Sequence, residues 1–477
     1  MQWKPKRLSQ LSLHNQMVDW MTSLIQQGEW TIGMKLPPQR KLAEMLEVNR
    51  STIIQVIDEL KAEGLLETKI GGGTFVANNS WNVLLNKSQP NWQKHIQSSI
   101  HKPNYHTIQL INEYEQDESM IRLGTGELSP DLLPTTLLEE SLQSMTLNAR
   151  DIGYSEPKGS KRLRIALSKY LGKQGIQASP ESILIVSGAL QALQLISVGL
   201  LEQQSIIFQE HPSYLNSVHP FQSAGMQMVS VQRNERLEET LKSLKGKRQS
   251  LFYTVPTLHN PTGRIMSVKE RHRLLDICSE LQIPIIEDNV YEELLFENPV
   301  PALKSFDRSG QVLYLGSVSK TLSPGLRIGW VVAPEPVINR LADIKMQTDY
   351  GSSAFSQEIV AHWLETGIYD QHVVQLRQQL QQRSAFIEGI LEKEFKGVAT
   401  WEKPKGGFYI WLRFNEPIVN KAWFLKLLKQ KVLINPGYIY DSNDMHHIRF
   451  SYAYASLAEL QEGLAILLSS IKNIELN

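Results

Sequence analysis

Three kinds of feature are scarce in this sequence of 477 residues, and each scarcity excludes a class of protein. The single cysteine, Cys278, excludes an intrachain disulfide and a cysteine metal cluster, which favours a reducing cytoplasm. The chain contains no run of about 18 apolar residues, so we expect no membrane span. The basic start is followed by Leu8-Ser9-Gln10 and not by an apolar core, so we expect no signal peptide either.

An excess of charge is also absent. The 49 lysines and arginines equal the 49 aspartates and glutamates, so the formal net charge is zero. Net charge therefore gives no support to nucleic-acid binding, and any basic surface must be local. What the chain does have is length and 42% hydrophobic residues, enough for two or three folding units.

Composition divides the chain into three zones. Residues 1–78 are compact and end near a glycine cluster. Residues 79–118 are rich in Asn, Gln, Ser and His without sustained periodicity, which is typical of a linker. Residues 119–477 alternate short apolar runs with helical stretches, which predicts an α/β domain with a mainly parallel sheet. We expect a large part to about residue 350 and a small C-terminal lobe over 351–477.

The first zone shows helical periodicity followed by a glycine turn. Its pattern predicts three helices and then a hairpin, over 11–27, 39–46, 50–63, 65–69 and 74–77. This order of elements is that of a winged helix, which lays one helix in the major groove of double-stranded DNA. The pattern alone leaves a small helical protein-interaction module as the alternative.

Polar residues at the start of the third expected helix are the candidates for DNA contact. Arg50 suits a base edge or a phosphate, and the helix N-terminus with Ser51 and Thr52 can offer hydroxyl and N–H groups to a phosphate. The segments that carry a resemblance to the GntR family of winged-helix regulators are Leu36–Ala43, Val48–Thr52, Glu63–Leu66 and Gly73–Val76. The resemblance implies that operator DNA is contacted by Arg40, Arg50, Ser51, Thr52 and the wing glycine, Gly71.

In the third zone, Lys320 follows the apolar run 312–315. Alone, such a lysine is usually a solvated loop residue, but its neighbours fit a pyridoxal phosphate site. That cofactor requires an amine, a carboxylate at the pyridine nitrogen, donors to the ring hydroxyl and a stacking ring. Asp288 supplies the carboxylate at the end of another apolar run. Tyr291 and Asn260 are assigned as donors to the ring hydroxyl, and Tyr214 is assigned to stack on the ring face.

The phosphate and a ligand carboxylate require donors as well. Ser187, Gly188 and Ala189 follow an apolar run and open a helix, so their N–H groups predict an anion site. The remaining donors are assigned to Ser317, Ser319 and Arg327 for the phosphate, and to Arg449 for a carboxylate. The pair His446-His447 lacks spaced partners, so we expect no metal site.

These motifs, in this order from about Arg122 onward, resemble the fold-type I aminotransferases of class I/II. The resemblance implies a transferase-like large domain, a small α/β C-terminal lobe and pyridoxal 5'-phosphate held by Lys320 as an aldimine. It places the backbone of Gly126 near the carboxylate of a substrate or effector. It also implies a homodimer, because the tyrosine matching Tyr154 reaches the phosphate bound in the partner subunit.

A GntR-type head followed by such a domain resembles the MocR subfamily of bacterial regulators. The resemblance implies a cytoplasmic homodimer, nucleoid-associated when bound to operator DNA, that senses an amine, an amino acid or pyridoxal phosphate itself. Two alternatives stay open. One is an active aminotransferase that carries a DNA-binding head, since every residue for the reaction is present. The other is a regulator whose cofactor pocket no longer functions.

Overall fold

The computed structural model describes most of the chain, namely residues 3–6, 12–26, 29–31, 33–69, 72–77, 104–145, 153–232, 236–244, 246, 248–297 and 299–475. The chain divides into two compact units, 1–102 and 103–477. Among the described residues, no helix is both long enough and apolar enough to cross a membrane.

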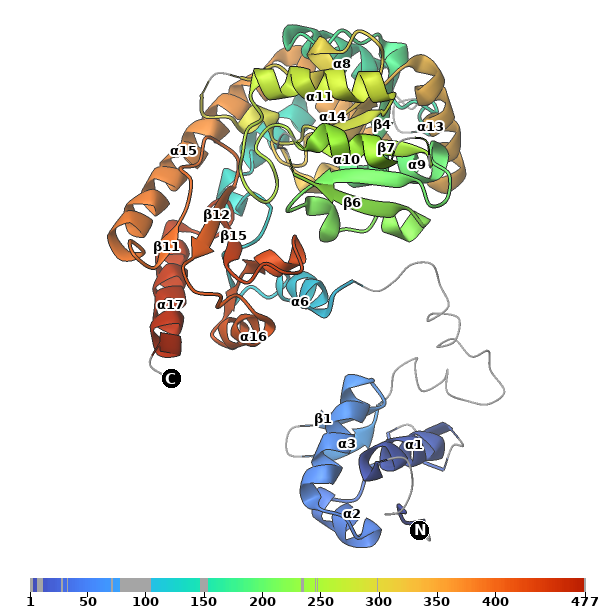
Figure 1. Cartoon of the computed structure of the whole chain (residues 1–477), viewed down its shortest axis with the longest axis vertical. Coiled ribbons are helices and arrows are strands. Elements are labelled where there is room, and N and C mark those ends of the chain that lie inside the picture. The colour runs from blue at the N-terminus through green and yellow to red at the C-terminus, as the bar shows by residue number, and fades with distance from the viewer. Residues whose placement is uncertain are drawn as a thin grey trace. The chain divides into compact units, whose positions relative to one another are not determined.

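The first unit is a three-helix fold with a two-stranded hairpin (Figure 1). Its elements are α1 (Leu13–Gln26), α2 (Gln39–Leu46), α3 (Arg50–Ala62), β1 (Leu66–Lys69) and β2 (Gly73–Val76). Residues at helical spacing on α3, among them Ile53, Ile57 and Leu60, are buried against α1 and α2 in one core. The five predicted elements are confirmed, with ends that differ by no more than two residues.

The second unit is built on a seven-stranded sheet of order β4-β10-β9-β8-β7-β5-β6. The strands are β4 (Ile183–Val186), β5 (Ile206–Glu210), β6 (Gln227–Val231), β7 (Ser250–Thr254), β8 (Ile285–Asp288), β9 (Val312–Ser317) and β10 (Gly329–Val332). Strands β5 to β9 pair in parallel, and β10 runs antiparallel to both of its neighbours. The mainly parallel sheet is therefore confirmed.

Helices cover both faces of this sheet, as the alternation of side chains along the strands requires. Leu184 and Val186 of β4 face α9 (Ala189–Gly199) and α13 (Glu335–Thr348). Ile183 and Ile185 face the opposite side, where the sheet packs against α8 (Lys161–Lys173) and α14 (Ala354–Thr366). Further along that side lie α10 (Leu237–Leu244), α11 (Val268–Leu281) and α12 (Leu303–Phe306). The short helix α7 (Thr135–Ser144) contacts α14.

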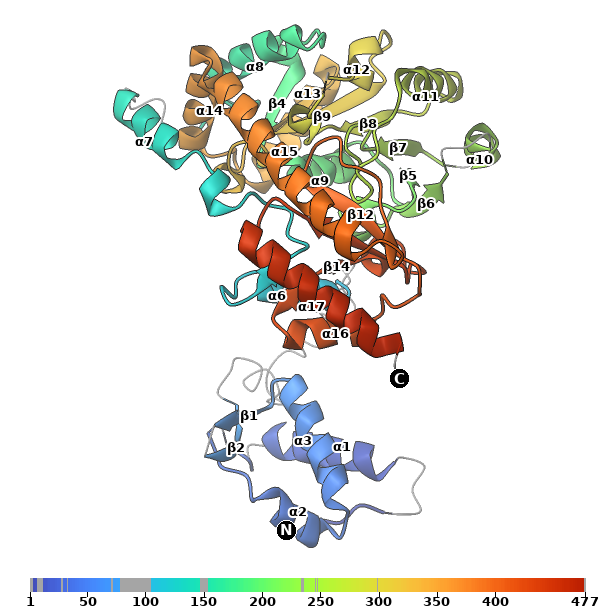
Figure 2. The same ribbon diagram turned by 90° about the vertical axis from the view of Figure 1, so that its left-hand side faces the viewer.

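A smaller lobe packs around a second, antiparallel sheet of order β11-β12-β15-β14. Its strands are β11 (Ala399–Thr400), β12 (Tyr409–Phe414), β14 (Asn435–Pro436) and β15 (His447–Ser451). Helices α16 (Lys421–Lys429) and α17 (Leu457–Glu475) pack on it. The long helix α15 (Ile368–Glu394) contacts α14 of the large part and α17 of the lobe, as Figure 2 shows.

The lobe also takes in residues from the start of the unit. Strand β3 (Ile121–Arg122) pairs in parallel with β13 (Val432–Leu433). Helix α6 (His106–Tyr114) buries Ile108 and Ile111 in the same core. The sequence placed residues 104–118 in a linker, because one nine-residue helix with two buried positions gives only a weak periodic signal. Of the assigned linker, residues 79–103 lie outside the described part of the chain.

Candidate functional site

A pocket of about 350 Å³ lies in the second unit, at the carboxyl ends of β8 and β9. The edge where parallel strands end is where α/β sheets bind ligands. Twelve of the predicted cofactor and ligand residues line it together: Gly126, Gly188, Ala189, Tyr214, Asn260, Asp288, Tyr291, Ser317, Ser319, Lys320, Arg327 and Arg449. The structure thus brings together residues that the sequence spreads over more than 300 positions.

Asp288 ends β8 and is 4% exposed. Its Oδ2 accepts a hydrogen bond of 2.8 Å from the Tyr253 hydroxyl, while Oδ1 has no hydrogen-bond partner. Burial raises the pKa of this carboxyl to about 6, although the Tyr253 hydrogen bond and the Lys320 charge lower it. An orphaned carboxylate oxygen in a buried pocket fits a protonated ring nitrogen, which would supply both the missing donor and a positive charge.

Lys320 lies just beyond β9, and its Nζ donates a hydrogen bond of 2.7 Å to the Gly126 carbonyl. The hydroxyls of Tyr291 and Tyr409 are 3.1 Å apart beside it in the pocket lining. A side chain at Gly126 would collide with the Tyr409 hydroxyl. A glycine is therefore required for the backbone at this position to lie so close to Tyr409.

A cradle suited to an anion forms where α9 begins. Gly188 precedes the helix with a φ of 87°, and Arg327 donates from Nη2 to the Ser187 carbonyl at 2.7 Å. A Cβ at Gly188 would lie 2.6 Å from that guanidinium nitrogen. Ser317 and Ser319, whose Oγ atoms are 3.0 Å apart, line the same pocket. The N–H groups of a helix start, a guanidinium and two hydroxyls together fit a phosphate.

Arg449 on β15 is 6% exposed and held on several sides. Its two terminal nitrogens donate to Asn260 Oδ1 at 2.9 Å and to the Gly124 carbonyl at 2.8 Å, and its Nε has no partner. The guanidinium carbon lies 4.1 Å from the ring centre of Tyr409 and 5.3 Å from that of Tyr440. These contacts fix the guanidinium plane, as recognition of a carboxylate requires.

Two predicted cofactor residues lie outside the lining. Ser187 does not line the pocket: its Oγ is 3.4 Å from the Ser352 hydroxyl, and its N–H donates to Gln191 Oε1. The Tyr154 side chain is on the surface, with the residue 84% exposed, and its ring centre is 5.1 Å from that of Tyr350. Exposure leaves Tyr154 available to a second subunit, and its predicted role there stays a prediction.

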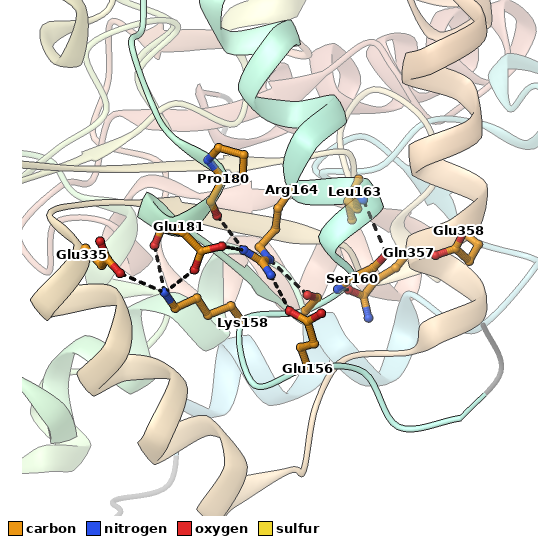
Figure 3. Close-up of polar contacts among 11 residues, drawn as sticks. Glu156, Lys158, Ser160, Leu163, Arg164, Pro180, Glu181, Glu335, Gln357 and Glu358 are labelled. Atoms are coloured by element: carbon orange, nitrogen blue, oxygen red, sulfur yellow. Dashed lines mark hydrogen bonds and ion pairs between the residues drawn. The ribbon is translucent and has the colours of Figure 1, made fainter. Parts of the chain in front are cut away.

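The loop that carries Tyr154 is anchored by the buried side chain of Arg164 (Figure 3). Arg164 donates to the carbonyls of Gly159 and Pro180 and pairs with Glu156 at 2.6 Å and Glu181 at 2.9 Å. Lys158 pairs with the same Glu181 at 2.8 Å. A loop with an exposed tip therefore has a fixed base.

Sequence reasoning missed other lining residues, namely Glu115, Tyr253, Tyr409, Asn435 and Tyr440. Tyr253 lies inside an apolar run. The only local clue to the direction of its hydroxyl was that side chains at Phe252, Tyr253 and Thr254 alternate between the two faces of the strand. Tyr409 and Asn435 come from short strands of the smaller lobe. Their position depends on how the lobe packs, for which the local sequence carries no signal.

Three of the candidate DNA contacts lie at the start of α3, and each of the three is at least partly exposed. Arg50 begins α3 and Ser51 follows, both exposed, and Thr52 is half-buried. Arg40 on α2 has a side chain that is 85% exposed and lies 3.5 Å from Glu44. Gly71 lies outside the described residues. This arrangement presents a helix N-terminus and a guanidinium to solvent, where a phosphate or base edge can meet them.

Comparison with known proteins matches both units. The family described as "Aminotransferase class I and II" matches residues 118–467, and "Bacterial regulatory proteins, gntR family" matches residues 13–76. The chain is 48% identical over 467 residues to "Uncharacterized HTH-type transcriptional regulator YisV" of Bacillus subtilis (strain 168), covering 97% of this chain and 96% of that protein. It is 38% identical over 448 residues to "HTH-type transcriptional regulator NorG" of Staphylococcus aureus (strain N315), covering 92% of this chain and 100% of the relative.

Solved structures match the second unit. A kynurenine aminotransferase of Pyrococcus horikoshii is 30% identical with a TM-score of 0.73, covering 78% of this chain and 96% of that one. An archaeal alanine:glyoxylate aminotransferase is 26% identical with a TM-score of 0.75, covering 80% and 100%. These matches confirm the predicted fold-type I architecture.

Proposed function

We propose that the second unit binds pyridoxal phosphate and senses a small amine or amino acid. The chain belongs to the GntR family of bacterial regulators. It joins a GntR-type DNA-binding head to a class I and II aminotransferase domain, as MocR-type regulators do. The role as a transcription regulator and the presence of an operator-binding head follow from membership of this family. The cofactor, the effector and a homodimer are the proposed part. We infer a role in regulation, with cofactor chemistry serving ligand detection.

One observation carries the proposal. Lys320, Asp288 and Arg449 line a single pocket, and two of them offer atoms without partners, Asp288 Oδ1 and Arg449 Nε. Buried polar atoms without partners cost free energy, so they are expected where a ligand completes them. Pyridoxal phosphate, when bound, supplies an aldehyde carbon for a primary amine and an electron-withdrawing ring.

The chain's own residues would divide the work. Asp288 would keep a proton on the ring nitrogen, and Lys320 would present its amine to the aldehyde. The start of α9, Arg327 and the two serines would hold the phosphate. Arg449 would hold the carboxylate of an amino acid.

A sensor must also convert binding into a change of shape. Lys320 and Asp288 belong to the large part of the second unit, whereas Arg449 belongs to the smaller lobe. A ligand held by both would favour their closed arrangement. Such a ligand alters the affinity for the operator only if it binds one arrangement of the regulator more tightly than the other.

Cofactor binding is tested with the full-length protein incubated with pyridoxal phosphate and freed of excess by gel filtration. We expect the wild type to retain the visible absorbance of lysine-bound cofactor, Lys320→Ala to lose it, and Lys269→Ala, at an exposed helix start, to keep it. Colourless wild-type protein, or coloured Lys320→Ala protein, would contradict the proposal.

Sensing is tested on DNA selected from random sequence by the wild-type protein. Candidate amines should change operator affinity in the wild type and leave the affinity of Lys320→Ala unchanged.

The second candidate function is an active aminotransferase, which the contact of Lys320 with Gly126 favours by holding the amine inside the pocket. Release of a keto acid from an added amino acid at many turnovers per subunit would favour that candidate.

A further inference from the structure

One wall of the pocket comes from α6, which the sequence had placed in the linker. Ile108, Ile111 and Asn112 of this helix line the pocket, and so does Glu115, which follows its last turn. Glu115 is partly buried and is the acid that α6 presents to the lining. The wall therefore combines an apolar surface with one carboxylate.

Three successive residues, Gly124, Thr125 and Gly126, each form a hydrogen bond with a charged side chain of the pocket. The carbonyl of Gly124 accepts from Arg449 at 2.8 Å, and the carbonyl of Gly126 accepts from Lys320 at 2.7 Å. Between them, the buried Thr125 donates from Oγ1 to a carboxylate oxygen of Glu115 at 3.0 Å. Because one short segment contacts all three groups, the carboxylate of Glu115 has a defined place relative to Arg449 and Lys320.

A second acceptor lies beside Arg449. Asn435 is 7% exposed, and its Nδ2 donates to the Tyr440 hydroxyl at 3.3 Å, while its Oδ1 has no partner. A side chain at Gly124 would collide with this amide, so glycine is what allows the segment to pack against Asn435. Beside Arg449, the pocket thus holds a buried acceptor without a partner in addition to the carboxylate of Glu115.

We propose that Glu115, with Asn435 beside it, forms a subsite for the far end of the effector, and that the effector is an amino acid with a second, positively charged amine. This inference rests on the proposed function. A carboxylate on Arg449 and an ammonium on Glu115 would neutralise the charges of these two side chains. An uncharged side chain would cover Glu115 and leave its charge in an apolar surrounding, which is unfavourable.

The electrostatics of Glu115 agree with this assignment. Burial raises its pKa above the ordinary value, and its Thr125 hydrogen bond opposes that rise. Placing a cation against the carboxylate would stabilise its charged form. A competing role is that Glu115 merely offsets the charge of Arg449, in which case it would influence every amino acid equally.

The test compares L-ornithine with L-norleucine, which has a terminal methyl group where ornithine has its ammonium. Both share the amine and carboxylate that Lys320 and Arg449 would meet. The cofactor-loaded full-length protein is titrated with each by calorimetry. We expect ornithine to bind roughly tenfold to a hundredfold more tightly, the size of a hydrogen bond to a charged group. Equal affinities would overturn the proposal without any variant.

Glu115→Gln should remove most of that preference while keeping the cofactor absorbance. Glu127→Gln is the matched control, because Glu127 is exposed, acts on Glu115 only through its charge and does not line the pocket. A preference that survives Glu115→Gln, or a loss of affinity equal for both ligands, would contradict the subsite. Missing cofactor absorbance in the wild type would instead contradict the proposed function.

Discussion

The two units place their candidate binding residues in opposite surroundings. In the first, Arg50 and Arg40 stand in water on neighbouring helices close in sequence. In the second, Asp288 and Arg449 are almost fully buried and come from distant segments. DNA is a large charged surface that an exposed helix end can reach. A small ligand must be surrounded, so its partners are buried and fixed beforehand.

The two surroundings also differ in the free energy that it costs to place a charged group in them. Burial raises the pKa of Asp288 to about 6, of Glu287 to about 7 and of Glu292 to about 8. Glu287 is compensated, since it accepts from the N–H groups of Leu303 and Lys304 at 2.8 Å each. Asp288 keeps an oxygen without a partner. The candidate ligand site of the second unit therefore lowers the stability of that unit, as functional sites often do.

The largest effect should come from breaking the core of the first unit alone. Leu60→Ala removes a side chain with no exposed surface, which should lower the unit's free energy of unfolding by about 2–5 kcal/mol. Scanning calorimetry should show the transition of the first unit shifting while that of the second stays in place. Lys61→Ala, one residue on, is the control. A joint shift of both transitions would show that the two units do not unfold independently.

A comparable effect, of opposite sign, is expected in the second unit. The raised pKa of Asp288, about 6 against an ordinary 3.8, means that the folded protein binds a proton more tightly than the unfolded one. Its contribution to stability is complete below about pH 4 and is lost as pH rises through about 6. The charged form thus costs about 3 kcal/mol at pH 8.

Asp288→Asn should therefore raise the melting temperature of the cofactor-free protein at pH 8, with little gain at pH 4, and should weaken cofactor binding. Thermal unfolding at both pH values and cofactor titration measure the two effects. A gain that is equal at both pH values would rule out ionisation as its cause.

The next effect concerns the exposed site of the first unit. Arg50→Ala should cost about 1–3 kcal/mol of operator binding, or roughly tenfold to a hundredfold in affinity, and leave the cofactor absorbance intact. Fluorescence anisotropy with labelled operator measures it, and Lys61→Ala at the other end of α3 is the control. Unchanged operator affinity would remove Arg50 from the interface.

The smallest effect should follow from Arg164→Lys, which keeps the charge but loses the forked hydrogen bonds to Gly159 and Pro180 (Figure 3). We expect a loss of about 1 kcal/mol and faster proteolysis within residues 153–159. Arg340→Lys is the control, since its side chain is half-exposed and pairs with the exposed Asp343. Equal cleavage in both variants would show that Arg164 does not secure the Tyr154 loop.

Much of the fold and site could be predicted because the signals are local. The periodicity of residues 11–63 fixes which face of each helix is apolar, and strand β8 had to deliver Asp288 to the edge of the sheet. The place of Lys320 in this pocket was predictable from the residues that accompany it. The assignment of Ser187 stays a prediction, because the motif shows that a helix starts there but does not specify the partners of this residue.

What the sequence by itself determined is the kind and order of the elements, the two-unit plan and most of the residues proposed to bind the cofactor. Each of these depends on neighbours within a few residues. Only the tertiary structure decided that α6 forms a wall of the pocket, that β10 runs antiparallel to its neighbours, and that Glu115, Tyr409 and Asn435 line one pocket with Arg449. The physical reason is that such contacts depend on which distant apolar surfaces are buried together, and that choice is made by the whole core.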